Sequence, residues 1–80
     1  MVTLLYFAQV REAVGRGSET IDLPDGIATA GDLVDWLAQR YPVFANRSRL
    51  HVAIDQVMAG FDTTIGSARE IAFFPPVTGG

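Results

Sequence analysis

Short segments in which apolar and polar residues alternate, or in which strand-forming residues gather, recur along this chain. Residues that alternate in a strand point to opposite faces of a sheet, so each segment predicts one strand. In the last segment, Ile71 and Phe73 fall on one face, and Ala72 and Phe74 on the other. The predicted strands are 2–8, 19–24, 51–55, 57–61 and 70–74.

One longer segment has helical periodicity instead. Thr29 is placed to cap a helix, with Asp32 three residues later in capping-box position, and Pro42 stops it after Tyr41. A shorter helical turn is expected over 9–15, and 43–50 is expected to be a loop. The apolar residues of the main helix share one stripe: Leu33, Val34, Leu37, Ala38 and Tyr41.

The resulting order is β-β-α-β-(β)-β, which predicts an α+β domain. A helix with one apolar stripe needs a sheet to cover, and the alternating strands supply it. We expect a mixed sheet of four to five strands packed on one main helix. With 80 residues, the chain forms a single domain over 1–80.

Composition narrows the classes of partner and compartment. The net charge is −3 and no basic cluster occurs, so nucleic acid and anionic membrane are not expected as partners. No stretch is long enough to span a bilayer. Cysteine is absent, which excludes disulfides and thiol chemistry and fits a cytoplasmic location. All six basic residues are arginine, so no side chain can accept an isopeptide bond.

The chain lacks a recognisable catalytic constellation. His51 is the only histidine, and it opens a predicted strand with no nucleophile nearby in sequence. The carboxylates are scattered without metal-binding spacing, and the glycine-rich stretch 15–18 lacks the lysine of a phosphate-binding loop. We therefore expect no metal site, no bound cofactor and no self-sufficient enzyme.

The C-terminus, FFPPVTGG, is the most distinctive segment. Pro75 and Pro76 favour an extended path away from the sheet, so 75–80 is predicted to be a flexible tail. From Pro76 the tail extends roughly 12–15 Å, at about 3.1–3.5 Å per residue. Gly79 and Gly80 have no side chains, so the tail is able to thread a narrow channel and offer its own carboxylate as the reactive group.

Phe74 is the residue at which the fold should meet a partner. If Phe73 fills the core, Phe74 lies on the other face, beside the tail. An accessible aromatic residue in that position is typical of an interface anchor.

The ending AFFPPVTGG, the opening YFAQVREAVG and the strand VAIDQ together resemble the small subunits of molybdopterin synthase, the MoaD family. The resemblance covers nearly the whole chain, and the ending is its most specific part. It implies a ubiquitin-like β-grasp fold. It also implies a cytoplasmic heterotetramer with the large synthase subunit.

The resemblance further implies a role in molybdenum cofactor biosynthesis. An E1-like adenylyltransferase of MoeB type would use ATP to adenylylate Gly80, and a sulfur donor protein would convert the acyl-adenylate to a thiocarboxylate. The tail would then enter the large subunit and pass sulfur to cyclic pyranopterin monophosphate. The small subunit itself would be a non-catalytic sulfur donor.

Site residues are carried over by motif. Gly80 is the expected thiocarboxylate carrier, and the residues that thread the tail are Gly79, Thr78, Pro76 and Pro75. The expected contacts with the large subunit are Phe7, Arg11, Met58 and Phe74. Phe7 should lie near Phe74 if their strands expose the same face.

Two departures from the family pattern bear on partner affinity and not on function. The family often has Asn where this chain has Asp55. Its turn before the last strand is usually more acidic, of DGDEV type, whereas this chain has GSAREI, with Arg69.

Three other functions remain open from the sequence. A sulfur carrier for thiamin thiazole synthesis shares the fold and the glycine pair, but such carriers tend to be shorter and usually lack the FFPP entry. A ubiquitin-like protein modifier is compatible with the terminus, although the missing lysines rule out lysine-linked self-chains. The third open function is a plain interaction domain whose tail has no chemical role.

Overall fold

The computed structural model describes residues 1–76, so Val77 to Gly80 lie outside the described part. Five strands, two α-helices and two 3₁₀-helices follow one another along the chain. In order they are β1 (Val2–Tyr6), α1 (Ala8–Val14), β2 (Ser18–Ile21), α2 (Ala30–Ala38), η1 (Pro42–Ala45), η2 (Arg47–Arg49), β3 (His51–Ile54), β4 (Val57–Ala59) and β5 (Glu70–Phe74).

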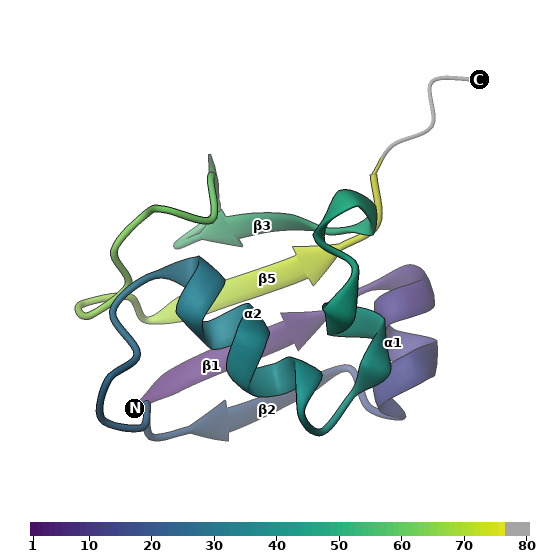
Figure 1. Ribbon diagram of the computed structural model, residues 1–80, viewed down its shortest axis with the longest axis horizontal. Helices are drawn as coiled ribbons and strands as arrows, with labels where there is room; N and C mark the ends of the chain where they lie inside the picture. Colours follow the sequence, from purple (N-terminus) through teal and green to yellow (C-terminus); the bar gives the residue numbers. More distant parts are fainter. Residues whose placement is uncertain (77–80) are drawn as a thin grey trace.

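The strands form one mixed sheet in the order β2-β1-β5-β3-β4 (Figure 1). The two central strands, β1 and β5, run parallel, and every other neighbouring pair is antiparallel. The α+β class and the five-stranded mixed sheet are therefore confirmed. Because β1 and β5 are parallel, both end at the same edge of the sheet, where the C-terminal segment leaves the domain (Figure 1).

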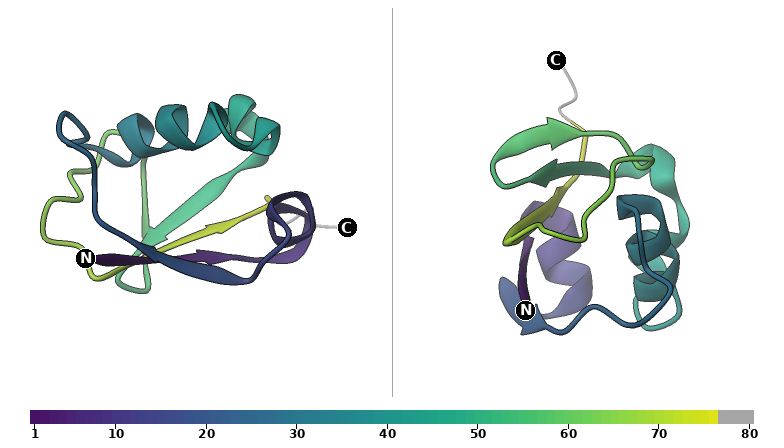
Figure 2. Two further views of the ribbon diagram at one scale, coloured as in Figure 1. Left: turned by 90° about the horizontal axis from the view of Figure 1, so that it is seen from below. Right: turned by 90° about the vertical axis from the view of Figure 1, so that its left-hand side faces the viewer.

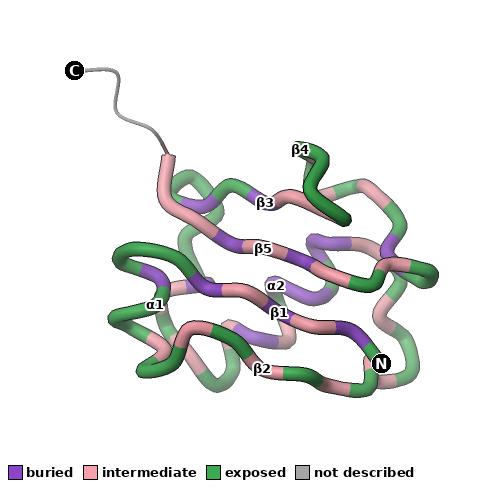
Figure 3. Tube along the Cα trace, turned by 180° about the vertical axis from the view of Figure 1, so that it is seen from behind, coloured by how far each residue is buried: buried purple, intermediate pink, exposed green. Residues whose placement is uncertain are grey.

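Helix α2 covers only one face of the sheet (Figure 2). We call the covered side the inner face and the opposite side the outer face. The alternation of burial along β1 and β5 follows from this arrangement, since every second side chain points to the helix (Figure 3). Over the described residues, no helix is both long and apolar enough to cross a membrane.

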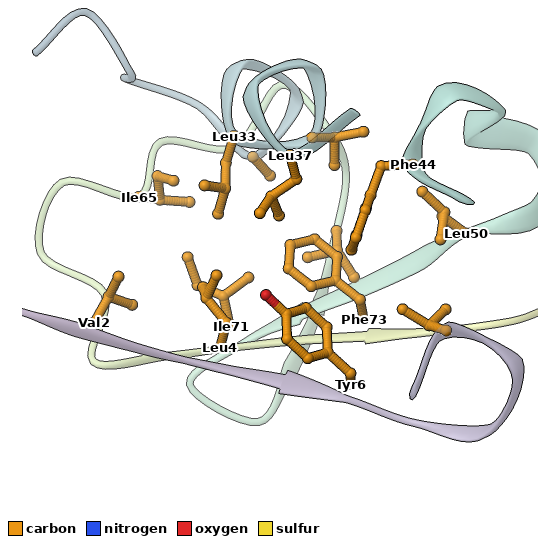
Figure 4. Close-up of a cluster of buried hydrophobic side chains, with 14 residues drawn as sticks. Val2, Leu4, Tyr6, Leu33, Leu37, Phe44, Leu50, Ile65, Ile71 and Phe73 are labelled. Carbon is orange, nitrogen blue, oxygen red and sulfur yellow. The ribbon is translucent and has the colours of Figure 1, made fainter. Parts of the chain in front are cut away.

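The core lies between α2 and the inner face (Figure 4). Phe73 is fully buried there, packed edge-on against Phe44 and stacked with Tyr6 at ring-centroid distances of 5.0 and 6.1 Å. Leu33, Val34 and Leu37 bury the predicted stripe of α2. The remaining large core side chains come from the strands, from α1 and from loops: Val2, Leu4, Val10, Leu50, Val52, Ile65 and Ile71.

The start of α2 matches the predicted capping box. The Thr29 hydroxyl accepts the backbone N–H of Asp32 at 3.1 Å, and the Asp32 carboxylate accepts that of Thr29 at 3.1 Å. The predicted end at Tyr41 was wrong, since α2 ends at Ala38. Pro42 holds the preceding residue away from helical geometry, so Tyr41 is extended and the last turn tightens before it.

The interpretation of 43–50 as a loop was wrong. Two 3₁₀-helices occupy most of it, and Phe44 in η1 is fully buried among the core aromatic residues. Arg47 fastens η2 to the helix layer, because its guanidinium donates to the Gly31 carbonyl at 3.1 Å and pairs with Asp35 at 3.0 Å.

The first two strands are shorter than predicted. β1 ends at Tyr6 because α1 starts at once: Phe7 is its extended N-cap, and Ala8 has a positive φ of 51°. The 9–15 turn is thus a true helix, ended as expected by Gly15 in the left-handed region. β2 covers Ser18–Ile21 and not 19–24, in keeping with Pro24, which has no N–H to offer a sheet.

Candidate functional site: the outer face and the base of the tail

Phe73 and Phe74 lie on opposite faces of β5, as predicted. Phe73 is buried in the core, whereas Phe74 is partly exposed on the outer face. The fold ends at Phe74, and Pro75 and Pro76 carry the chain beyond the sheet (Figure 1). The tail therefore begins beside an aromatic side chain that the core does not use.

Phe7 is the neighbour of Phe74 across the parallel pair. Tyr6 is in register with Phe73, and the Phe7 N–H donates to the Phe73 carbonyl at 3.1 Å. Alternation after buried Tyr6 turns Phe7 outward, where its side chain is 48% exposed. The structure thus brings Phe7 and Phe74 together next to the tail, which was the sequence-based expectation.

His51 also belongs to this site, although in the sequence it stands out only as the residue that opens a predicted strand. It is the antiparallel partner of Phe74, and its ring stacks on the phenyl ring at 5.8 Å with an interplanar angle of 16°. The signal that identifies it is the register between β3 and β5. No periodicity within either strand contains that information.

Met58 lies on the same face, nearer the sheet edge. It is paired with Ala53, which is paired in turn with Ala72, so the three form a row across β4, β3 and β5. Met58 is 59% exposed, and its strand lies two strands from β5, about 10 Å away at the usual spacing. We call Phe7, Phe74, Met58, Leu5, Ala53 and Ala72 the outer apolar surface.

Arg11 lies on α1, one turn beyond Phe7, whose carbonyl accepts its backbone N–H at 3.3 Å. Its guanidinium lies over the loop before β2, since a Cβ on Gly17 would come within 3.3 Å of Arg11 Cζ. Arg11 therefore borders the outer apolar surface at the α1 end and does not lie among Phe7, Phe74 and Met58.

The two departures from the family pattern are joined in one turn far from the tail. Asp55 and Gln56 both have positive φ in the tight β3–β4 turn. Asp55 Oδ1 accepts the backbone N–H groups of Arg69 and Glu70, each at 3.0 Å. Asparagine could accept both bonds with its side-chain oxygen, so Asp55 does the same structural work in this chain.

The predicted residues Thr78, Gly79 and Gly80 lie outside the described residues. What the structure does place is the base of the tail. Pro75 and Pro76 border a groove of about 390 Å³ between α1 and η2. Its other lining residues are Gln9, Ser48 and Arg49.

Charge is distributed unevenly along the sheet direction. Most carboxylates lie at the end where β1 begins. Arg11 and Glu12 of α1, Arg16 just after α1, and Arg49 of η2 lie at the opposite end, where β1 and β5 finish. The acidic end carries Asp22, Asp25, Asp32, Asp55, Asp62 and Glu70. The chain is acidic overall, yet it presents its tail from its more basic end.

Within residues 1–76, no group of three or more acidic or histidine side chains is arranged to hold a metal ion. The buried titratable group near the site is Tyr6, whose hydroxyl donates to Glu19 at 3.0 Å. Burial first, and the bond to Glu19 second, raise the pKa of this phenol above its ordinary value. This phenol is held in its neutral form near neutral pH and, stacked with Phe73, supports the core. At this end of the protein, the segment Pro75–Pro76 leaves the sheet beside the partly exposed Phe74 and the exposed Phe7.

A family model and several curated proteins match this chain over most or all of its length. The ThiS family model matches residues 4–80. The molybdopterin synthase sulfur carrier subunit of Haemophilus influenzae is 41% identical, and that of Escherichia coli 35% identical, with the whole of both chains aligned in each case. Small archaeal modifier protein 1 of Haloferax volcanii is 35% identical over 92% of this chain and 94% of its own.

Solved structures agree on the fold. The crystal structure of SAMP1 from Haloferax volcanii matches with a TM-score of 0.75 and 28% identity, covering 99% of this chain and 98% of that one. A putative molybdopterin converting factor subunit 1 from Pyrococcus furiosus matches with a TM-score of 0.74 and 25% identity, covering 95% and 97%.

Proposed function

The chain belongs to the ThiS family, and we propose that it is the sulfur-carrier small subunit of a molybdopterin synthase. The observation that carries the proposal is end-to-end identity of 41% with a carrier subunit of that name. The structure supports it with two neighbouring aromatic residues, the exposed Phe7 and the partly exposed Phe74, at the base of a tail that ends in two glycines.

The chemistry takes place at the terminal carboxylate. An E1-like adenylyltransferase joins a Gly80 carboxylate oxygen to the α-phosphorus of ATP and releases pyrophosphate. The terminal sulfur of a persulfide on a donor protein then attacks the acyl carbon, and AMP leaves. A thiol cleaves the S–S bond of the resulting acyl disulfide, which releases the thiocarboxylate and leaves a disulfide on the donor. The carrier holds no cofactor of its own in this scheme, and the large subunit supplies the site in which sulfur reaches cyclic pyranopterin monophosphate.

The domain's own contribution is presentation. The outer apolar surface docks on the large subunit, with Phe74 and Phe7 as anchors beside the tail, Met58 towards the sheet edge and Arg11 at the α1 end. Pro75 and Pro76 direct the tail away from the sheet, so docking and threading occur together. We place the resulting heterotetramer in the cytoplasm.

A ubiquitin-like modifier is the second candidate, favoured by the TM-score of 0.75 to SAMP1. Its terminus would form an isopeptide bond with a lysine of a target protein. The higher identity to the Haemophilus influenzae carrier subunit, 41% against 35% for the archaeal modifier, ranks it second.

The decisive experiment is intact-mass measurement after incubation with the activating enzyme, ATP and a sulfur source. We expect the mass change of one oxygen-to-sulfur exchange, and a variant lacking Gly80 is the matched control. An unchanged mass for the full chain would contradict every carrier function.

Adding purified large subunit and cyclic pyranopterin monophosphate then separates the pathways. Molybdopterin formation and loss of the added sulfur from the carrier are the expected results. A thiocarboxylated chain that neither binds the large subunit nor makes molybdopterin would favour a carrier for thiamin thiazole synthesis. Attachment to lysines of other proteins would favour the modifier.

A further inference from the structure

The groove at the base of the tail has a polar lining that the outer apolar surface does not share. Gln9 of α1 stands on one side, Ser48 and Arg49 of η2 stand on the other, and Pro75 and Pro76 complete it. Both prolines lack an N–H, and the Ser48 hydroxyl already donates to Asn46, so the side-chain donors left to the groove are the Gln9 amide and the Arg49 guanidinium.

Arg49 is held on a well-defined platform. Its backbone N–H donates to the Asn46 carbonyl at 3.1 Å, and the Asn46 side chain accepts the Ser48 N–H at 3.2 Å. The next residue, Leu50, is buried in the core. The fold therefore sets the backbone position of Arg49, and only the long side chain can adjust.

The guanidinium of Arg49 has no carboxylate partner within residues 1–76. The ion pair in that part of the chain joins Arg47 to Asp35. Arg47 is only two residues from Arg49 in sequence, but its side chain is directed to the helix layer. Arg47 serves the fold through that pair, whereas the exposed Arg49 makes no contact that the fold requires.

We propose that Arg49 and Gln9 form a carboxylate-binding groove that seats an acidic side chain of the large synthase subunit at the point where the tail enters it. The inference rests on the proposed function. A planar guanidinium and a neighbouring amide suit a carboxylate, which accepts two parallel hydrogen bonds. The groove adjoins Phe74 through Pro75, so it continues the surface already assigned to that partner.

A small phosphorylated ligand fits the position less well than a protein carboxylate. The reacting carboxylate belongs to Gly80, and four residues of extended chain from Pro76 place it up to about 14 Å away. The phosphate of a substrate lies near that reacting end, in the partner's own pocket. A partner group that reaches Pro75 and Pro76 would come from the rim of the large-subunit channel that the tail enters.

The test compares binding of the full-length carrier and its variants to purified large subunit, by calorimetry at two salt concentrations. Arg49→Glu should weaken the complex at least about tenfold, which corresponds to about 1.4 kcal/mol, and should flatten its salt dependence. Gln9→Glu, which places a competing carboxylate beside Arg49, should weaken it in the same direction. Arg49→Lys should lose less affinity than Arg49→Glu, because the charge remains and only the planar guanidinium is lost.

Arg40→Glu is the matched control, because it makes the same charge change on the helix side of the domain. Thermal melting of each variant separates folding from binding. Arg49→Glu should have the same melting temperature as the wild type. An equal loss of affinity for Arg40→Glu and Arg49→Glu would overturn the groove in favour of general electrostatic attraction. Unchanged affinity for Arg49→Glu would overturn it outright.

Two further arms identify the source of the carboxylate. If Arg49→Glu weakens the complex with the activating enzyme and leaves the large-subunit complex intact, the assignment to the large subunit is overturned. Restoration of Arg49→Glu binding by a Glu→Arg change at the channel rim of the large subunit would establish the contact. Failure of the wild-type carrier to bind the large subunit would instead count against the proposed function.

Discussion

The ring of His51 stacks on the ring of Phe74 across the antiparallel pair of β3 and β5, with centroids 5.8 Å apart. The contact lies on the outer face, directly before the prolines that open the tail. Two residues 23 positions apart in the chain therefore fix the orientation of one side chain at the proposed interface.

Substitution of the two adjacent phenylalanines should separate folding from docking. Phe74→Ala should weaken the complex with the large subunit by about 2 kcal/mol or more, as for an interface hot spot, while the domain stays folded. Phe73→Ala should cost about 3–5 kcal/mol of unfolding free energy, because it empties the centre of the aromatic core. Urea denaturation and calorimetry measure the two effects, and a larger stability loss for Phe74→Ala would show that the faces are reversed.

Removal of His51 should reduce affinity through Phe74. His51→Ala should weaken the large-subunit complex by about 0.5–1.5 kcal/mol, the usual range for a paired aromatic contact. In a double-mutant cycle the effects of His51→Ala and Phe74→Ala should be less than additive, since the histidine acts by holding the phenyl ring. His51→Phe keeps a ring at the position and serves as the control. Strict additivity would mean that His51 contacts the partner independently.

The capping box should make stability depend on pH below neutrality. The backbone N–H groups of Ala28 and Thr29 hydrogen-bond to Asp32 and lower the pKa of its carboxyl below the ordinary value of 3.8. A depressed folded-state pKa contributes stability above the unfolded value, and this contribution is lost as the pH falls through the folded value. Asp32→Asn should therefore remove part of the acid sensitivity.

Unfolding free energies measured by urea at pH 7 and pH 3 give the comparison. Thr29→Ala, which removes the other half of the box, should destabilise the domain by about 1 kcal/mol at both pH values. The expectation fails if Asp32→Asn and the wild type lose the same stability between pH 7 and pH 3.

The buried phenol of Tyr6 should act at the opposite end of the pH scale. Burial and the bond to Glu19 raise the pKa of its phenol, so the stability that it contributes is full below its ordinary value of 10 and falls as the pH rises beyond it. Tyr6→Phe should cost about 1 kcal/mol at pH 7 through the lost hydrogen bond, and should lessen the alkaline loss. Unfolding at pH 7 and pH 11 checks this, and an equal alkaline loss in Tyr6→Phe would contradict it.

Local physics made several features predictable from the sequence. Alternation alone put Phe73 and Phe74 on opposite faces, because successive side chains of any strand point to opposite sides. The Thr29–Asp32 box was predictable because both of its hydrogen bonds close within three residues. The terminal glycine pair and the two prolines likewise define a presentable tail without any knowledge of the fold.

Tertiary structure decided what depends on partners distant in the chain. Phe44 lies in a segment with no periodicity, and it is buried only because η1 folds back against Tyr6 and Phe73. The stack of His51 on Phe74 requires the β3–β5 register, and the groove of Gln9, Arg49 and Pro76 requires three separate elements to meet at one edge. The sequence by itself predicted the C-terminal glycine pair as the reactive end of the chain. Strand pairing and loop closure determined the surface around the C-terminal segment. Both bring distant residues together, and the contacts that form must offset the entropic cost of closing the loops.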